Sequence, residues 1–279
     1  MGIFLAFVVA LLESFKDVLS KELLKTLNPF VFVVCVKVLS FILLLPTILI
    51  PFTISDTTTF ALVYSLNVFL NLISLLFYFT AIKYSPLSLS LPMLTFSPVF
   101  LLITSYIMLG ERVSFTGMLG VVMVFVGSYL LNISKTRAGF FEPIKGIFKE
   151  RGSRYMLVVA LIWSITANLD KIGVKLSSPL IWPLFMSGGI GFLGLALLKI
   201  RGESVEINPK MLLVSLADSL GGISQMVAVS LTFVPYVISI KRLSVLFSSL
   251  WGIIVFKERA NFLGIILMVL GAAMITLFG

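Results

Sequence analysis

Residues 29–51, PFVFVVCVKVLSFILLLPTILIP, contain only one charged side chain, that of Lys37. About 20 mainly apolar residues are enough for a helix to cross the ~30 Å hydrocarbon core of a bilayer. A proline at the first helical position loses no hydrogen bond, so Pro29 is a favourable start for this helix. The stretch therefore predicts a transmembrane helix with one buried lysine, and it sets the pattern for the rest of the chain.

The whole chain has the same apolar character. Of its 279 residues, 59% are hydrophobic and 12% are charged, whereas soluble domains average about 45–50% and about 25%. The mean hydropathy is +1.15. We therefore expect an all-α integral membrane protein, multi-pass in the cell membrane, with lipid as the solvent for most of its surface. The apolar runs predict ten transmembrane helices, near residues 2–20, 29–51, 58–81, 86–108, 114–133, 154–174, 179–199, 209–232, 235–256 and 261–278.

The two halves of the chain are similar to each other. Ordered matches in Lys, Pro, Glu and Gly recur at offsets of 150, 147 and 144 residues: Lys21 with Lys171, Pro29 with Pro179, Glu111 with Glu258, and Gly120 with Gly264. The expected parts are a first five-helix repeat at 1–133, a polar linker at 134–153 and a second repeat at 154–279. Because five is odd, the second repeat enters the membrane inverted, as in many secondary transporters. The fold is therefore predicted to be two inverted five-helix repeats.

Basic residues favour the face that holds the linker. Fourteen of them lie there: Lys21, Lys25, Lys83, Lys135, Arg137, Lys145, Lys149, Arg151, Arg154, Lys199, Arg201, Lys210, Lys257 and Arg259. Three lie on the face that holds both termini: Arg112, Lys171 and Lys175. Since cytoplasmic loops carry an excess of Lys and Arg, the linker is predicted to be cytoplasmic.

Several polar side chains fall inside the predicted helices, where an ionisable group costs at least about 2.5 kcal/mol and needs a partner or a function. The candidates for substrate binding are Lys37, Asn71, Asn168, Gln225, Lys241 and Arg242. The candidates for coupling or charge balance are Glu13, Lys16, Asp17 and Asp218. Two adjacent cations on one helix point about 100° apart, so one carboxylate is poorly placed to satisfy both Lys241 and Arg242. The pair suits an anion with several oxygens.

Structural interpretations remain open beside these functional ones. Glu13 and Lys16 are three residues apart and could neutralise each other on one helix. Lys37 could be held by Asp218 or by Glu13 as a packing ion pair. Lys16 and Asp17 could reach toward the membrane surface. Lys241 and Arg242 could pair internally with Asp218.

Three stretches carry a resemblance to a known family: SKELLKTLNPFVFVVCVKVLSFILLLP at 20–46, AIKYSPLSLSLPMLTFSPVFLLITSYIMLGERVSFTGMLGVVMVFVGSYLL at 81–131, and the repeat of the latter at 234–275. They resemble the EamA family of the drug/metabolite transporter superfamily. The resemblance implies ten helices around a central cavity, transport of a small metabolite, and termini in the cytoplasm, opposite to the loop charges. IKRLSVLFSS at 240–249 is also similar to a helix of triose-phosphate translocators, in which a Lys-Arg pair binds substrate phosphate.

Other function classes find little support. The chain has no histidine and one cysteine, which excludes an internal disulfide and predicts no metal site, and it shows no nucleotide-binding or hydrolase motif. Its cations are scattered, so nucleic acid is not expected as a partner. We expect a secondary transporter, exporter or exchanger, of a small polar and anionic metabolite, without cofactor or catalytic residues, as a monomer or homodimer. A proton or a counter-substrate would couple it. The alternative is a flippase-like protein or an intramembrane enzyme acting on a lipid-linked substrate.

Overall fold

The structure is a computed structural model that describes residues 1–85, 87–134, 141, 144–145, 150–204, 208–247 and 262–278. All regular secondary structure in these ranges is helical. A helix satisfies its backbone hydrogen bonds internally, which is what a chain surrounded by hydrocarbon requires. The expectation of an all-α protein is therefore confirmed for the part of the chain that the structure describes.

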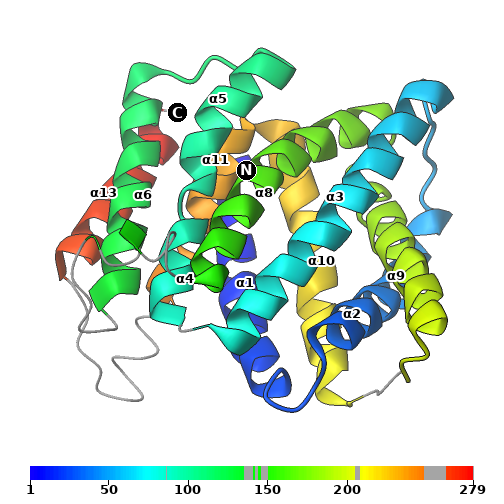
Figure 1. Ribbon diagram of the computed structural model, residues 1–279. Helices are drawn as coiled ribbons and strands as arrows, with labels where there is room; N and C mark the ends of the chain where they lie inside the picture. The colour runs from blue at the N-terminus through cyan, green and yellow to red at the C-terminus, as the bar shows by residue number, and fades with distance from the viewer. Residues whose placement is uncertain are drawn as a thin grey trace.

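The helices of the first half follow one another with short connections. They are α1 (Gly2–Leu23), α2 (Pro29–Leu44) continued by the 3-10 turn η1 (Leu45–Leu49), α3 (Thr57–Tyr84), α4 (Leu87–Leu94), α5 (Ser97–Leu109) and α6 (Phe115–Ser134). Those of the second half are α8 (Arg151–Leu176), α9 (Trp182–Arg201), α10 (Lys210–Leu231), α11 (Val234–Lys241) and α13 (Phe262–Phe278). The view in Figure 1 places the N and C labels in its upper half.

The helix expected over 86–108 is wrong as a single element, because a turn at Thr95 and Phe96 divides it into α4 and α5. Pro98, in the first turn of α5, has no N–H with which to bond the carbonyl of Leu94. The amides of Thr95 and Phe96 instead donate to carbonyls three residues back, at 3.3 Å each. Pro98 lies inside the apolar run 86–108, and the structure shows a two-residue turn immediately before the helix that it helps to begin.

The helix expected over 235–256 is interrupted in the same way. It ends as α11 at Lys241, a turn follows at Arg242 and Leu243, and helix resumes over 244–247. The Leu243 amide donates to the Ile240 carbonyl at 2.9 Å, again three residues back. Residues 248–256 of this expected helix, and with them Glu258, lie outside the described residues.

By length and composition, the described residues contain six candidate membrane spans, one of which runs through the turn between α4 and α5. They are Pro29–Leu49, Thr57–Tyr84, Pro92–Leu109, Arg151–Leu176, Trp182–Arg201 and Lys210–Leu231. Two shorter apolar helices, Phe115–Leu131 and Phe262–Phe278, accompany them. α1 has the length of a span, but it carries Glu13, Lys16 and Asp17 in its middle. Large apolar side chains such as Leu62, Phe192 and Leu263 are exposed, as expected for surfaces that face lipid.

Helices from the two halves pack against each other in pairs. α1 packs on α10, α3 on α8, α2 on α9 and α6 on α13, and Figure 1 shows α6 and α13 side by side. The last pair approaches closely because glycines face backbone there. A Cβ atom on Gly127 would lie 2.7 Å from the carbonyl oxygen of Gly264, and one on Gly271 would lie 2.6 Å from that of Gly120. Small residues allow such close crossings of membrane helices.

Asp56 caps α3 from the loop before it. Its carboxylate accepts hydrogen bonds from the backbone N–H of Thr58 at 3.0 Å and of Thr59 at 3.2 Å. Bonds from the side chain and backbone of Thr59 lower the pKa of this carboxyl below its usual range. The cap satisfies donors that a helix start leaves unpaired, and so fixes where α3 begins.

Candidate functional site

A cavity of about 180 Å³ lies among seven helices, α1, α2, α3, α8, α9, α10 and α11. Its ionisable lining residues other than tyrosine are Glu13, Lys16, Lys37, Asp170, Asp218, Lys241 and Arg242. These are four cations and three carboxylates, so the formal charge of the lining is 4 − 3 = +1. Such a concentration of charge within a helical membrane protein is typical of a functional site.

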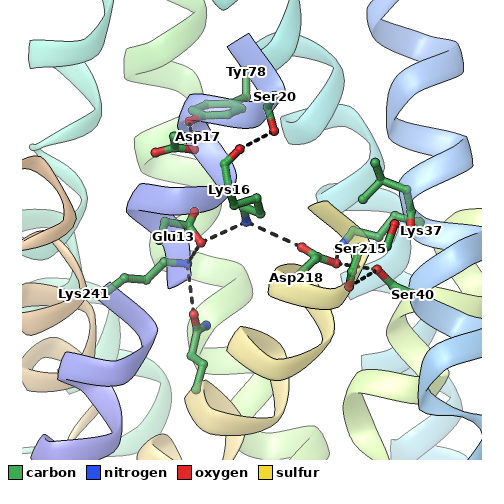
Figure 2. Close-up of polar contacts among 12 residues, drawn as sticks. Glu13, Lys16, Asp17, Ser20, Lys37, Ser40, Tyr78, Ser215, Asp218 and Lys241 are labelled. Atoms are coloured by element: carbon green, nitrogen blue, oxygen red, sulfur yellow. Dashed lines mark hydrogen bonds and ion pairs between the residues drawn. The ribbon is translucent and has the colours of Figure 1, made fainter. Parts of the chain in front are cut away.

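Asp218 on α10 joins the two halves of the chain at the cavity. Its Oδ2 accepts a hydrogen bond from Lys37 Nζ on α2 at 2.7 Å and one from the Ser40 hydroxyl at 3.1 Å. Lys16 Nζ on α1 lies 3.5 Å from its Oδ1 (Figure 2). The expected ion pair between Lys37 and Asp218 is therefore present, and two cations share this carboxylate.

Glu13 on α1 links Lys16 to Lys241. Lys16 Nζ lies 2.9 Å from Glu13 Oε2, and Lys241 Nζ lies 3.6 Å from the same oxygen. Lys241 also donates to Gln225 Oε1 on α10 at 3.0 Å. Figure 2 shows the resulting chain of contacts from Lys241 through Glu13 and Lys16 to Asp218. The neutralisation of Glu13 by Lys16 within one helix is thus present, and Lys16 lines the cavity instead of reaching for the membrane surface.

Arg242 differs from the other cations because its described partners are neutral. Its Nε and Nη2 donate to the Ser97 hydroxyl at 3.2 Å and 2.7 Å, and its Cζ lies 5.8 Å from the centre of the Trp163 ring. The residue is 7% exposed. Its hydrogen bonds go to no carboxylate in the part of the chain that the structure describes. A buried guanidinium with spare donors can receive an anion.

The interrupted helices bring Arg242 and Ser97 together. Arg242 is the first residue after α11 and Ser97 is the first residue of α5. The two turns therefore meet at the cavity wall, one from each half of the chain. Discontinuous helices of this kind are typical of transporter binding sites.

The structure distributes the other predicted site residues differently. Asn71 lines the cavity, and its Nδ2 donates to Asn67 Oδ1 at 2.7 Å. Asn168 is outside the lining, because its amide is buried between α8 and α5, where it donates to the Thr104 hydroxyl at 3.1 Å. Asp17 is also outside the lining, and it accepts a hydrogen bond from the Tyr78 hydroxyl at 3.1 Å.

Asp170 and three aromatic side chains, Tyr78, Trp163 and Trp182, also line the cavity, and sequence reasoning missed them. Asp170 lies near the expected end of its helix, where a single carboxylate does not by itself indicate a binding site. A usable signal was its spacing from Trp163, because residues seven apart share one face of a helix.

A separate buried ion pair lies toward the end of the bundle that holds the chain termini. Lys171 Nζ on α8 lies 2.6 Å from Glu111 Oε1 in the α5–α6 connection and 2.7 Å from the Thr232 carbonyl oxygen. Glu111 Oε2 accepts from the Ser105 hydroxyl at 2.5 Å and from the Val234 amide at 2.9 Å. The Glu111 carboxylate thus ties the first half of the chain to α8 and to the start of α11 in the second half.

A second hollow at the start of α1 is lined by mainly apolar residues and carries no charged side chain. Among the described residues, no group of three His, Cys, Asp or Glu side chains is placed to hold a metal ion.

Comparisons with known proteins agree with this architecture. Residues 1–133 match the model of the EamA-like transporter family, so the resemblance inferred from the sequence is confirmed. Members of this family are membrane transporters. None of the curated proteins matches the chain at a significant level.

One solved structure with a similar fold is a crystal structure that is described only as that of a protein. Its TM-score is 0.75 and its identity to this chain is 17%, and the match covers 99% of this chain and 97% of that one. At this identity the likeness concerns the fold alone, and it covers nearly the whole chain.

Proposed function

We propose that the chain is a secondary transporter of a small polar metabolite with an anionic group, which binds at Arg242 and Lys241 in the central cavity. The observation that carries this proposal is the state of Arg242. Its guanidinium is buried at the cavity wall, and its described partners are a hydroxyl and an aromatic ring. Burying a charge without a counter-charge is unfavourable, so an anion that enters the cavity is stabilised there.

The balance of charge in the lining supports the same proposal. Glu13 and Asp218 neutralise part of the charge of the three lysines, and one positive charge remains overall. Lys241 Nζ lies 3.6 Å from Glu13 Oε2, and it donates its described hydrogen bond to the neutral Gln225 amide at 3.0 Å. A substrate anion can replace Glu13 as the ion-pair partner of Lys241, while Lys16 continues to neutralise the Glu13 carboxylate. Glu13, Lys16, Asp17 and Asp218 are thus assigned to charge balance or coupling, with a proton or a counter-substrate as the coupling species.

Alternating access would follow from two inverted repeats around the cavity, and helix packing supports that arrangement. A two-fold rotation that exchanges the halves would superpose α1 on α8 and α10 on α3. The contact of α1 with α10 then becomes the contact of α8 with α3, and both are present. The interruptions also correspond, since an offset of 147 carries Leu94 to Lys241 and Ser97 to Ser244. The repeats are assigned to residues 1–133 and 154–279, with ten crossings of the cell membrane.

The site assignment is tested by ligand binding to the purified protein. Small carboxylates and phosphates, with their uncharged analogues, are screened for stabilisation against thermal unfolding in detergent. A bound ligand at a hundredfold excess over its Kd raises the free energy of unfolding by about 2.7 kcal/mol. We expect anions to stabilise the protein and their uncharged analogues to leave it unchanged.

Variants then identify the site. Arg242→Ala should weaken anion binding by at least about tenfold, and Arg242→Lys should weaken it less, because it keeps the charge and loses the planar fork. Arg201→Ala is the matched control, because Arg201 is exposed at the end of α9, over the ring of Phe30. Equal anion affinity in the wild type, Arg242→Ala and Arg242→Lys would show that this arginine is structural.

A further inference from the structure

Asp170 lines the cavity, but its carboxylate has no role in the proposed anion site. Its Oδ1 accepts hydrogen bonds from Asn67 Nδ2 at 2.6 Å and from Trp182 Nε1 at 2.9 Å. Both donors are neutral, and within the described ranges no lysine or arginine forms an ion pair with it. A carboxylate in the interior of a membrane protein is unfavourable without a counter-charge. The other two cavity carboxylates, Glu13 and Asp218, both have lysine partners.

The neighbours of Asp170 hold one oxygen and leave the other one open. Asn71 Nδ2 donates to Asn67 Oδ1 at 2.7 Å, and this orients the Asn67 amide so that its NH₂ group faces Asp170. Trp182, on α9, approaches from a second helix. Both hydrogen bonds end on Oδ1, and Oδ2 has no described partner although the residue lines the cavity. The carboxylate is therefore held in place with one oxygen available to a ligand.

Asp170 and the arginine site occupy opposite ends of one helix face. Trp163, Thr166, Ala167 and Asp170 all line the cavity from α8, with the spacing i, i+3, i+4 and i+7 of a single face. At 1.5 Å per residue, Trp163 and Asp170 are about 10 Å apart along the helix. Arg242 lies over Trp163. The cavity face of α8 thus has the Arg242 guanidinium near one end and the Asp170 carboxylate near the other, separated by the small side chains of Thr166 and Ala167.

We propose that Asp170 binds a cationic nitrogen of the solute, so that the transported solute is dipolar, with its anionic group at Arg242. This inference rests on the proposed function and adds the class of solute to it. An ammonium group at Oδ2 supplies the counter-charge that Asp170 lacks. The spacing along α8 favours solutes whose two charged groups are well separated over those that carry both on adjacent atoms.

Two matched series of probes test this inference on the purified wild-type protein. The dipolar series is glycine, β-alanine, γ-aminobutyrate and ε-aminocaproate, and the plain series is acetate, propionate, butyrate and caproate. Apparent affinities come from thermal stabilisation and from tryptophan fluorescence, since Trp163 and Trp182 both line the cavity. We expect the longer dipolar probes to bind at least about tenfold more tightly than the plain acid of equal length. Equal affinity of the two series for the wild type would overturn the inference.

The variants assign the preference to this carboxylate. Asp170→Asn should abolish the preference and keep the binding of plain acids, whereas Asp56→Asn, in the loop before α3, should change neither. Should Asp170→Asn not fold, Asp170→Glu decides, because a longer side chain should shift the best probe to a shorter dipolar solute. A preference that survives in Asp170→Asn, or an unchanged best length in Asp170→Glu, contradicts the inference.

The two proposals fail in different ways. If plain acids bind through Arg242 and the amino group adds nothing, the dipolar solute is wrong and the anion site stands. If neither series binds to the wild type, the proposed anion site and the proposed dipolar solute are both wrong.

Discussion

Charged side chains inside this molecule have two kinds of partner. Lys37 and Asp218 form a direct ion pair at 2.7 Å, and such a pair contributes to stability only if both members remain. Arg242 and Asp170 have neutral partners instead. The first kind is expected to respond to mutation mainly in stability, and the second mainly in ligand affinity.

The pair of Glu111 and Lys171 gives a direct test of the first kind. Glu111 is 7% exposed and Lys171 is 8% exposed. Glu111→Gln leaves the lysine buried without a counter-charge and should lower the free energy of unfolding by about 3 kcal/mol. The double variant Glu111→Gln/Lys171→Met removes both charges and should recover more than half of that loss. Thermal unfolding in detergent measures both effects.

An exposed pair provides the control for this prediction. Lys210 Nζ lies 2.5 Å from Glu22 Oε1, with side chains 53% and 55% exposed. Exposed pairs contribute little to stability, so Glu22→Gln should leave the melting temperature nearly unchanged. Equal losses in Glu22→Gln and Glu111→Gln would show that burial of the pair does not matter.

At these positions the sequence allowed some partners to be predicted and hid others. The Glu13–Lys16 pair follows from i, i+3 spacing, and the Lys37–Asp218 pair was one of two stated alternatives. The contact of Arg242 with Ser97 could not be predicted from the sequence, because it depends on two helix interruptions that lie next to each other only in the folded chain. Asp170 was missed because it is distinguished by its neutral partners, which come from α3 and α9, whereas its spacing from Trp163 indicates only a shared helix face.

Helices α6 and α13 cross closely, and this crossing depends on the absence of side chains at its glycines. A Cβ atom on Gly127 would lie 2.6 Å from Met268 Cγ and 2.7 Å from the Gly264 carbonyl oxygen. Overpacking usually lowers stability by about 1–3 kcal/mol. Gly127→Ala should therefore lower the free energy of unfolding by an amount in that range, measured by thermal or denaturant unfolding in detergent.

Gly221 on α10 is the matched glycine. A Cβ atom there would meet its nearest neighbour, Leu12 Cβ, at 3.9 Å. Gly221→Ala replaces glycine within a helix at no steric penalty and should leave stability equal or slightly higher. A loss in Gly221→Ala as large as that in Gly127→Ala would contradict the assigned role of the close crossing.

Element positions were mostly predictable, because hydrophobic run length determines where a helix can cross lipid. The start of α2 at Pro29 is an example. Continuity was less predictable. Pro98 indicated the break before α5. The turn at Arg242 has no proline beside it, because the nearest preceding proline, Pro235, lies at the start of α11. That break became understandable only from its correspondence to the first one.

The orientation of the whole molecule is predicted by its loop charges. The linker face carries most of the basic residues, so it should be cytoplasmic. Cys35 is the one cysteine and is buried, so it can be replaced by alanine before a single cysteine is introduced. In intact cells, an impermeant thiol reagent should label Thr57→Cys, near the start of α3, and should not label Ser134→Cys, at the end of α6. The reverse pattern would place both termini in the cytoplasm.

The two halves together define the function that we propose. Each supplies an interrupted helix, and the cavity lies where helices of both halves meet. The family match covers residues 1–133, and the fold match covers nearly the whole chain. The all-helical membrane architecture was predictable from the apolar runs, whereas the inverted arrangement of the two repeats stays a prediction. The solute depends on a few cavity side chains, and the sequence alone left it open.

Solute counterflow in vesicles that contain only this protein tests the central claim most directly. Vesicles are loaded with an excess of the solute that stabilises the wild type most, and labelled solute is added outside. We predict transient accumulation of the label, chemically unchanged, in wild-type and Arg201→Ala vesicles, and a loss of at least about tenfold in Arg242→Ala. Counterflow in Arg242→Ala equal to that of the wild type, or label recovered as a different compound, would contradict an anion-binding transporter.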